Sequence, residues 1–183
     1  LGNYAGLWCE ILESIECLKG NGPPDLMNLV YYLIKEAFQL MNVEYNEKTI
    51  KKTIYEGLAL NKFYEMIKAH GGSIKLFDDK KYNQPLFKGR IYSNQTGYIT
   101  YMKTKKLGMI LSDLCGRNNK NIELDFSAGI YFNKKVGDYI NEKEMIMEYF
   151  CSNKENFEKA QLLLNKTFYV ESSKQSLKKL IYK

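Results

Sequence analysis

The chain has little histidine, and its cysteines are not arranged as metal ligands. His70 is the single histidine in 183 residues, and no Cys-x-x-Cys spacing links Cys9, Cys17, Cys115 and Cys151. Zinc sites need Cys and His ligands at short spacings, so we expect no zinc centre. A lone histidine also leaves nothing from which to assemble a Ser-His-Asp or Cys-His constellation.

Arginine is nearly missing from a chain that is otherwise basic. The net charge is +6, but only Arg90 and Arg117 are arginines, and the lysines are interleaved with Glu, Asp and Asn. Proteins that read nucleic acid usually use arginine for bidentate contacts and cluster their charge. We therefore expect a solvated, lysine-rich surface and no nucleic-acid partner.

Long apolar runs are missing as well. No run approaches the ~20 residues that a membrane-spanning helix needs, and neither a signal peptide nor a disulfide framework is evident. We expect a cytoplasmic chain with reduced thiols and no membrane partner. The first residue is Leu1 rather than Met, which we interpret as the start of a piece of a longer protein.

The chain does have helical patterning in its first part. Apolar residues recur at helical spacing over residues 5–19, and a second stripe runs from Leu26 to Met41. Between them lies the turn "LKGNGPPDL" (18–26), whose glycines and prolines end one helix and admit the next. We expect the carboxylate of Asp25 to lie near the exposed N–H groups and the positive dipole end at the start of the second helix. Two further helices are predicted in 46–57 and 58–70.

The pattern changes after "LFDDKKYNQPLFKG" (76–89), which is polar, contains Pro85 and is typical of a linker. Beyond it the segments are short and rich in Tyr, Ile and Phe, which predicts strands, with helices at about 105–114 and 153–164. Helices first and strands later predict an α+β fold rather than a βαβ alternation.

Three segments could carry chemistry, and each has a simpler interpretation. "HGGSIK" (70–75) contains glycines and a lysine as phosphate loops do, but it closes a helix, so we interpret it, with His70, as a C-terminal cap. "YMKT" (101–104) resembles the Met-Lys pair of biotin carriers, although a helical pattern follows Lys103 at once. The acidic residues Asp78, Asp79 and Asp113 fit a solvated surface.

Taken together, the short motifs of the chain, in their order and spacing, resemble the C-terminal part of the thymidine and pyrimidine-nucleoside phosphorylases. The resemblance covers nearly the whole chain, and it is carried by "LG" at 1–2, "LKGNGPPDL", "EGLALNKFYEMIKAHGG", "LG" at 107–108, "GR" at 116–117, Asp125, "AGI" at 128–130 and "KKVGD". The chain departs from the family at His70, at "LCGR", and at "NEKEMI", which lacks the glycine that usually follows the Val-Gly-Asp turn.

The resemblance implies a division into two parts. Residues 1–77 would be a helical segment that completes the phosphorylase α/β domain, and residues 78–183 a hammerhead-like, strand-rich C-terminal subdomain. The family's phosphate loop and its base-binding Ser-x-x-Ser-Lys-Lys segment do not occur here and would lie upstream of Leu1. The implied parent is a homodimeric pentosyltransferase of pyrimidine salvage that converts nucleoside and phosphate to free base and pentose 1-phosphate.

The resemblance also implies one functional site, with no catalytic or cofactor-binding residue in this chain. Bacterial members hold a potassium ion beside the phosphate loop, and the matching ligands are the carbonyls of Leu1 and Tyr4 and the carboxylate of Glu13. Oxygen ligands suit a hard cation; a solvated helix residue is the alternative for Glu13. Three functions therefore stay open: an inactive scaffold piece of a phosphorylase, a biotin- or lipoyl-like carrier module, and a structural interaction domain.

Overall fold

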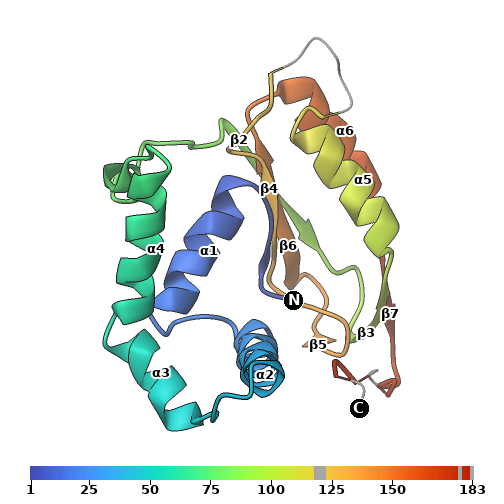
Figure 1. The fold of residues 1–183 in the computed structure, drawn as a ribbon. Helices are drawn as coiled ribbons and strands as arrows, with labels where there is room; N and C mark the ends of the chain where they lie inside the picture. The colour runs from blue at the N-terminus through green and yellow to red at the C-terminus, as the bar shows by residue number, and fades with distance from the viewer. Residues whose placement is uncertain (118–122, 177–178, 182–183) are drawn as a thin grey trace. The chain divides into compact units, whose positions relative to one another are not determined.

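Helices dominate the first half of the chain and strands the second half in this computed structural model, which describes residues 1–117, 123–176 and 179–181 (Figure 1). The predicted α+β class is confirmed. The chain divides into two units. One comprises Leu1–Gly2, Ile11–Tyr82 and Leu180–Lys183, and the other comprises Asn3–Glu10 and Asn83–Lys179. The predicted division at residues 77 and 78 into family domains stays a prediction.

The first unit is helical. Its elements are the larger part of α1 (Trp8–Leu18), α2 (Pro24–Leu40), α3 (Glu47–Tyr55), α4 (Leu58–Ala69) and the 3-10 turn η1 (Ile74–Phe77). Local chemistry fixes where the helices begin. The Asp25 carboxylate accepts a hydrogen bond from the Leu26 N–H at 2.9 Å, as predicted, and Asn46 caps α3 by accepting from the Thr49 N–H at 3.2 Å.

Helix α2 is apolar on two sides. One side packs within the unit: Met27 is buried, the Phe38 ring meets the edge of Tyr45 with centroids 5.9 Å apart, and the Lys51 ammonium lies 5.5 Å from the Tyr31 centroid. The other side follows a spacing of four and three residues, and its last members are exposed. It consists of Leu26, Val30, Leu33, Ala37 and Leu40.

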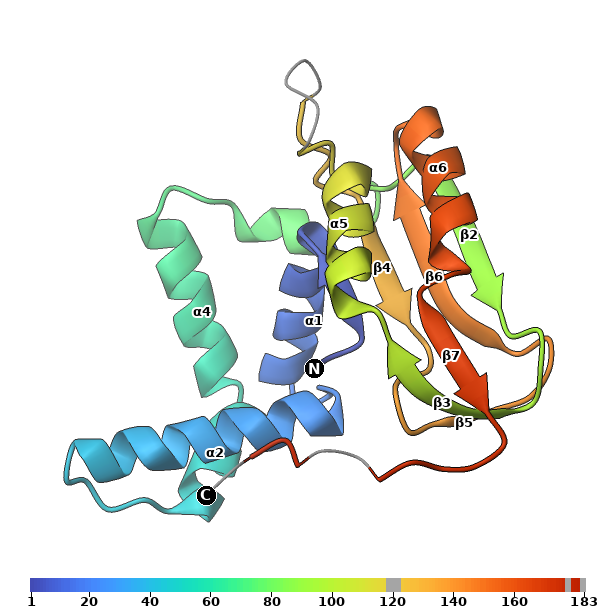
Figure 2. The ribbon, with the colours of Figure 1, turned by 90° about the vertical axis from the view of Figure 1, so that its right-hand side faces the viewer.

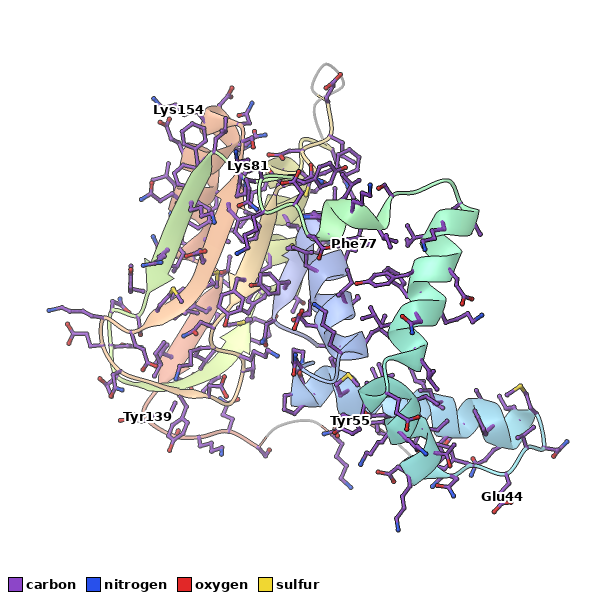
Figure 3. All side chains as sticks on the ribbon, turned by 90° about the vertical axis from the view of Figure 1, so that its left-hand side faces the viewer. Glu44, Tyr55, Phe77, Lys81, Tyr139 and Lys154 are labelled. Atoms are coloured by element: carbon purple, nitrogen blue, oxygen red, sulfur yellow. The ribbon has the colours of Figure 1, made fainter. Side chains whose placement is uncertain are left out.

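Few side chains are buried in this unit. Ile15, Met27 and Ile54 are the buried hydrophobic residues that its described helices contribute. Aromatic contacts tie η1 to α4, because Phe77 stacks on Tyr64 at 5.9 Å and lies 6.1 Å from Phe63 (Figure 3).

The second unit contains two antiparallel sheets. The four-stranded sheet has the order β1 (Tyr4–Gly6), β4 (Gly129–Phe132), β6 (Met145–Cys151), β2 (Phe87–Tyr92). The three-stranded sheet has the order β5 (Tyr139–Ile140), β3 (Gly97–Met102), β7 (Phe168–Glu171). Helices α5 (Thr104–Leu114) and α6 (Lys154–Leu164) lie side by side over them (Figures 1 and 2).

This unit has a continuous core. Side chains from both sheets and both helices are wholly inaccessible to solvent, among them Ile99, Leu114, Ile140, Ile146 and Leu164. The predicted helices at 105–114 and 153–164 are confirmed to within a residue at each end.

Three expectations about the elements were wrong. The first helix was expected from residue 5, but Tyr4–Gly6 form strand β1, which pairs with β4 so that Gly6 lies opposite Gly129. The glycine is required there, because a Cβ on Gly6 would lie 2.7 Å from the carbonyl oxygen of Ala128. The stretch 76–89, read as a linker, includes the last two residues of η1 and the first three of β2, and the four-residue strand β7 was not predicted.

Candidate functional site

The N-terminal segment brings the backbone of Gly2 against the carboxylate of Glu13. Gly2 has a φ of +70°, and a Cβ built on it would lie 2.5 Å from Glu13 Oε2 and 3.2 Å from Glu13 Cδ. Only a glycine leaves this space, so the carboxylate lies next to the peptide that follows Leu1. A carboxylate is a ligand type that hard cations take, so the chemistry of Glu13 suits the expected ion.

The predicted ligands do not all belong to one element. Leu1 and Glu13 are part of the first unit, with Glu13 in the middle of α1, whereas Tyr4 opens β1 in the second unit. Tyr4 is registered opposite Tyr131 of β4, and their ring centroids are 4.9 Å apart. The assignment of Leu1, Tyr4 and Glu13 to a cation stays a prediction. Among the residues that the structure describes, no three His, Cys, Asp or Glu side chains gather as metal ligands.

A hydrogen-bond network surrounds Asp125, a residue to which the sequence motifs assigned no contact. Asp125 Oδ1 accepts from the Ser127 N–H at 2.9 Å and from Ser127 Oγ at 2.6 Å. Its Oδ2 accepts from the Ser152 N–H at 2.5 Å, and the two serine hydroxyls are 3.0 Å apart. Both oxygens are thus used to tie the segment before β4 to the end of β6. The network positions the backbone, and Ser152 gives no sequence signal because its partner Asp125 lies 27 residues earlier in the chain.

The cysteines are unreactive thiols rather than nucleophiles. Burial raises the pKa of Cys9, Cys115 and Cys151 to about 11, from a usual 9.0. Such thiols stay protonated at neutral pH, and the thiolate is the reactive form. All four cysteines are free thiols.

The glycine segment at 70–75 caps a helix, as predicted. His70 is the C-cap residue of α4, and its N–H donates to the Met66 carbonyl at 3.1 Å. The acidic residues also fit the surface interpretation. Asp78 and Asp79 are exposed, and Asp113 faces the Lys159 ammonium at 3.6 Å.

Lys103 does not occupy the position that a carrier lysine needs. It lies at the junction of β3 and α5, where its N–H donates to the Thr167 carbonyl at 2.7 Å. Its ammonium lies 4.7 Å from the centroid of the Tyr169 ring. A carrier lysine sits at the tip of a hairpin with strands on both sides, so this geometry speaks against the carrier function.

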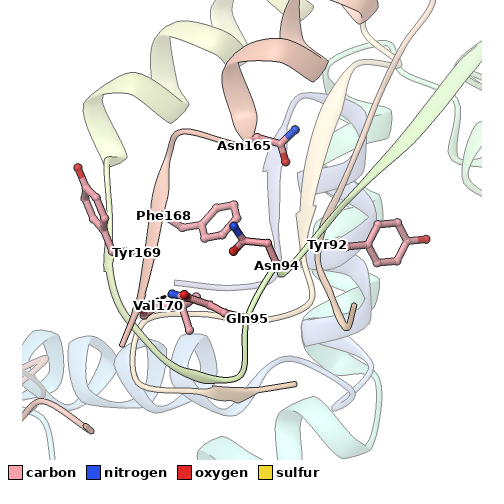
Figure 4. Close-up of a pocket in the computed structure, with 7 residues that line it drawn as sticks. All are labelled: Tyr92, Asn94, Gln95, Asn165, Phe168, Tyr169 and Val170. Carbon is pink, nitrogen blue, oxygen red and sulfur yellow. Dashed lines mark hydrogen bonds between the residues drawn. The ribbon is translucent and has the colours of Figure 1, made fainter. Parts of the chain in front are cut away.

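A hollow of about 420 Å³ lies between the turn that joins β2 to β3 and the start of β7 (Figure 4). Asn94, Asn165 and Phe168 point toward its centre, and Gln95 donates from Nε2 to the Val170 carbonyl at 2.5 Å. Tyr92 and Tyr169 point away from it. None of these seven described lining residues is charged, so charge pairing cannot hold a phosphate group there.

The described helices include none that is both long enough and apolar enough to cross a membrane.

Comparison with known proteins supports one family. Residues 98–171 match the family model of the pyrimidine nucleoside phosphorylase C-terminal domain. Over 178 residues, 94% of this chain, it is 33% identical to a thymidine phosphorylase of Metamycoplasma hominis. It is 32% identical to pyrimidine-nucleoside phosphorylases of Staphylococcus epidermidis over 161 residues and of Staphylococcus aureus over 153 residues. These matches support a C-terminal fragment of the thymidine and pyrimidine-nucleoside phosphorylase family.

The matched region covers only part of these relatives. The alignment spans 65% of the Metamycoplasma protein, 37% of the Staphylococcus epidermidis protein and 35% of the Staphylococcus aureus protein. Within the phosphorylase C-terminal domain, residues 98–171 run from β3 to β7 and so include the whole three-stranded sheet.

Proposed function

We propose that this chain acts as the C-terminal scaffold of a pyrimidine-nucleoside phosphorylase, an enzyme that converts a pyrimidine nucleoside and phosphate to free base and pentose 1-phosphate. The similarity to a thymidine phosphorylase along 94% of the chain is the observation that carries the proposal. Catalysis of such a transfer requires both reactants to be held in register, and the two substrate-binding motifs expected from the family do not occur in these 183 residues.

The second apolar side of α2 supports the scaffold role. Leu33 is 55% exposed and Leu40 is 86% exposed, and Ala37 between them is exposed as well. An apolar stripe along a helix normally faces a packed neighbour. The relatives are longer than this chain, so we propose that residues of the phosphorylase outside the matched region pack against this side of α2.

Glu13 has a defined part in this proposal. A potassium ion, when bound, would supply positive charge beside the phosphate loop, and Glu13 with the carbonyls of Leu1 and Tyr4 would hold it. The carboxylate packed against Gly2 is the support for this assignment. The helix fixes the position of the Glu13 backbone, so the chain's own task is to keep a negative ligand in place.

A direct assay tests the scaffold role. The purified 183-residue chain is incubated with uridine or thymidine and phosphate, and free base is followed by chromatography. We expect no base release above the blank without protein. Phosphate-dependent release that co-purifies with the chain would show that these residues contain a complete active site, and would overturn the scaffold assignment.

A further inference from the structure

The outer face of the three-stranded sheet carries four tyrosines. Tyr101 is 55% exposed, Tyr139 and Tyr169 are each 48% exposed, and Tyr98 is partly exposed. Tyr139 projects away from β5 in the view with side chains (Figure 3). Large aromatic side chains on a solvent-facing sheet surface are a feature of binding surfaces more than of ordinary solvated strands.

A β-bulge places two of these tyrosines on the same face. Residues three apart in a regular strand point to opposite faces, which would send either Tyr98 or Tyr101 into the core. The register of β3 against β7 shifts between Ile99 and Tyr101, so one extra residue is accommodated there. As a result Ile99 and Met102 are buried, with 0% and 8% exposure, and both tyrosines face outward. Bulges often re-aim side chains in this way at functional positions.

The tyrosines form two pairs that follow one another across the strands. Tyr98 lies opposite Tyr139 of β5, with ring centroids 5.1 Å apart and planes at 69°. Tyr101 lies opposite Tyr169 of β7, with centroids 6.0 Å apart and planes at 28°. Each pair leaves π surface open to solvent, and together they extend over all three strands.

A cation lies at one end of this tyrosine surface. The Lys103 ammonium is 4.7 Å from the Tyr169 centroid, and among the described residues Lys103 forms no ion pair. Glu171 lies opposite Tyr98, and its carboxylate accepts from Gln175 at 3.1 Å.

We propose that this tyrosine surface, formed by Tyr98, Tyr101, Tyr139 and Tyr169, binds single-stranded nucleic acid. Bases stack on the two tyrosine pairs, and a phosphate next to a stacked base lies near Lys103. Aromatic side chains on a sheet combined with a basic side chain are the elements that sequence-tolerant binding of single strands uses, because every base has a π face. The low arginine content led us to expect no nucleic-acid partner. It argues against recognition of base edges by hydrogen bonds, but base stacking does not need arginine.

Fluorescence anisotropy with the full chain tests this proposal. The probes are labelled eight-nucleotide oligo(U) and oligo(dT), titrated at several KCl concentrations between 25 and 200 mM. We expect saturable binding that weakens as salt rises. The double variant Tyr101→Ala/Tyr169→Ala is expected to weaken binding about tenfold or more, the loss of one stacked base. Lys103→Ala should reduce the slope of log affinity against log salt concentration by about one, as expected for the loss of one phosphate contact.

Matched variants distinguish a loss of base stacking from a loss of folding or of charge as the cause of weaker binding. Tyr101→Phe/Tyr169→Phe keeps both rings and should bind like the unmodified chain. Tyr55→Ala, which removes a tyrosine that is 73% exposed in α3, should also leave binding unchanged. Circular dichroism checks that each variant is folded. The proposal is overturned if the oligonucleotides do not bind at 25 mM KCl, if folded Tyr→Ala variants bind as tightly as the unmodified chain, or if a duplex of the same length binds as tightly as the single strand.

Discussion

Gly2 and Glu13 fit together so closely that any side chain at position 2 would displace the carboxylate: a Cβ there would lie 2.5 Å from Glu13 Oε2. The contact joins the start of the chain to the middle of α1. It gives the Glu13 carboxylate a defined place against the backbone of Gly2.

Glu13→Ala should weaken potassium binding in a phosphorylase that carries this chain as its C-terminal part. We expect the potassium concentration for half-maximal kcat/KM to rise about tenfold, because a lost ligand typically costs that much metal affinity. The unmodified protein should have a higher Tm in KCl than in choline chloride, and Glu13→Ala should lose this difference. Glu16→Gln, which removes a carboxylate paired with Lys19 on the same helix, is the control. An unchanged potassium dependence in Glu13→Ala would leave Glu13 as an ordinary helix residue.

Lys143→Gly should stabilise the chain. Lys143 has a φ of +64°, a left-handed conformation that glycine adopts without strain, and it stands in the segment where the family usually has a glycine after the Val-Gly-Asp turn. Relief of strain, less the entropy cost of glycine, should add about 1 kcal/mol to the free energy of unfolding. Urea unfolding measures it. Glu142→Gly, at the preceding position without a positive φ, should instead destabilise; equal effects from both would refute the strain argument.

Alkaline pH should destabilise the fold through the buried thiols. The folded pKa of Cys115 and Cys151 is about 11, against 9.0 for the usual thiol. Below pH 9 both states keep the proton and the contribution to stability is complete. Between pH 9 and 11 the unfolded chain loses the proton first, so the free energy of unfolding falls as pH rises.

Urea midpoints of the reduced protein at pH 8 to 11 test this expectation. Tyrosine and lysine also titrate in this range, so the comparison is with Cys151→Ala. The variant should be less stable at pH 8 because Cys151 is wholly buried, but its stability should fall less steeply with pH. A slope equal to that of the unmodified chain would contradict the assigned cause.

Limited trypsin digestion should cut first between about Ile74 and Lys88. Lys80 and Lys81 are exposed in the turns that follow η1, and loops of this kind are the preferred cleavage sites. Lys62 is the internal comparison, since its side chain is 80% exposed but lies within α4. Mass spectrometry of the early fragments gives the order of cleavage. A first cut after Lys103, which follows β3, or after Lys134, which follows β4, would mean that the boundary between the predicted parts is misplaced.

Periodicity and capping residues predicted most helices well because each is encoded locally. Asp25 lies in the first turn of α2, Asn46 caps α3, and the stripe in α2 was visible in the sequence. Strand β1 was missed because its three residues become a strand only through pairing with β4, more than 120 residues later. The same holds for the candidate surfaces. The bulge at Ile99–Tyr101 depends on β7, so the common face of Tyr98 and Tyr101 could not be read from their spacing.

The most direct test of the phosphorylase assignment is a chimera. The segment of the Staphylococcus epidermidis pyrimidine-nucleoside phosphorylase that aligns with this chain is replaced by residues 1–183, and phosphate-dependent release of uracil from uridine is measured. The account predicts a folded chimera with kcat/KM clearly above that of the same protein lacking the segment. It also predicts that Leu33→Asp/Leu40→Asp abolishes the gain, since both leucines would face the rest of the enzyme. A folded chimera without phosphorolysis would contradict the account.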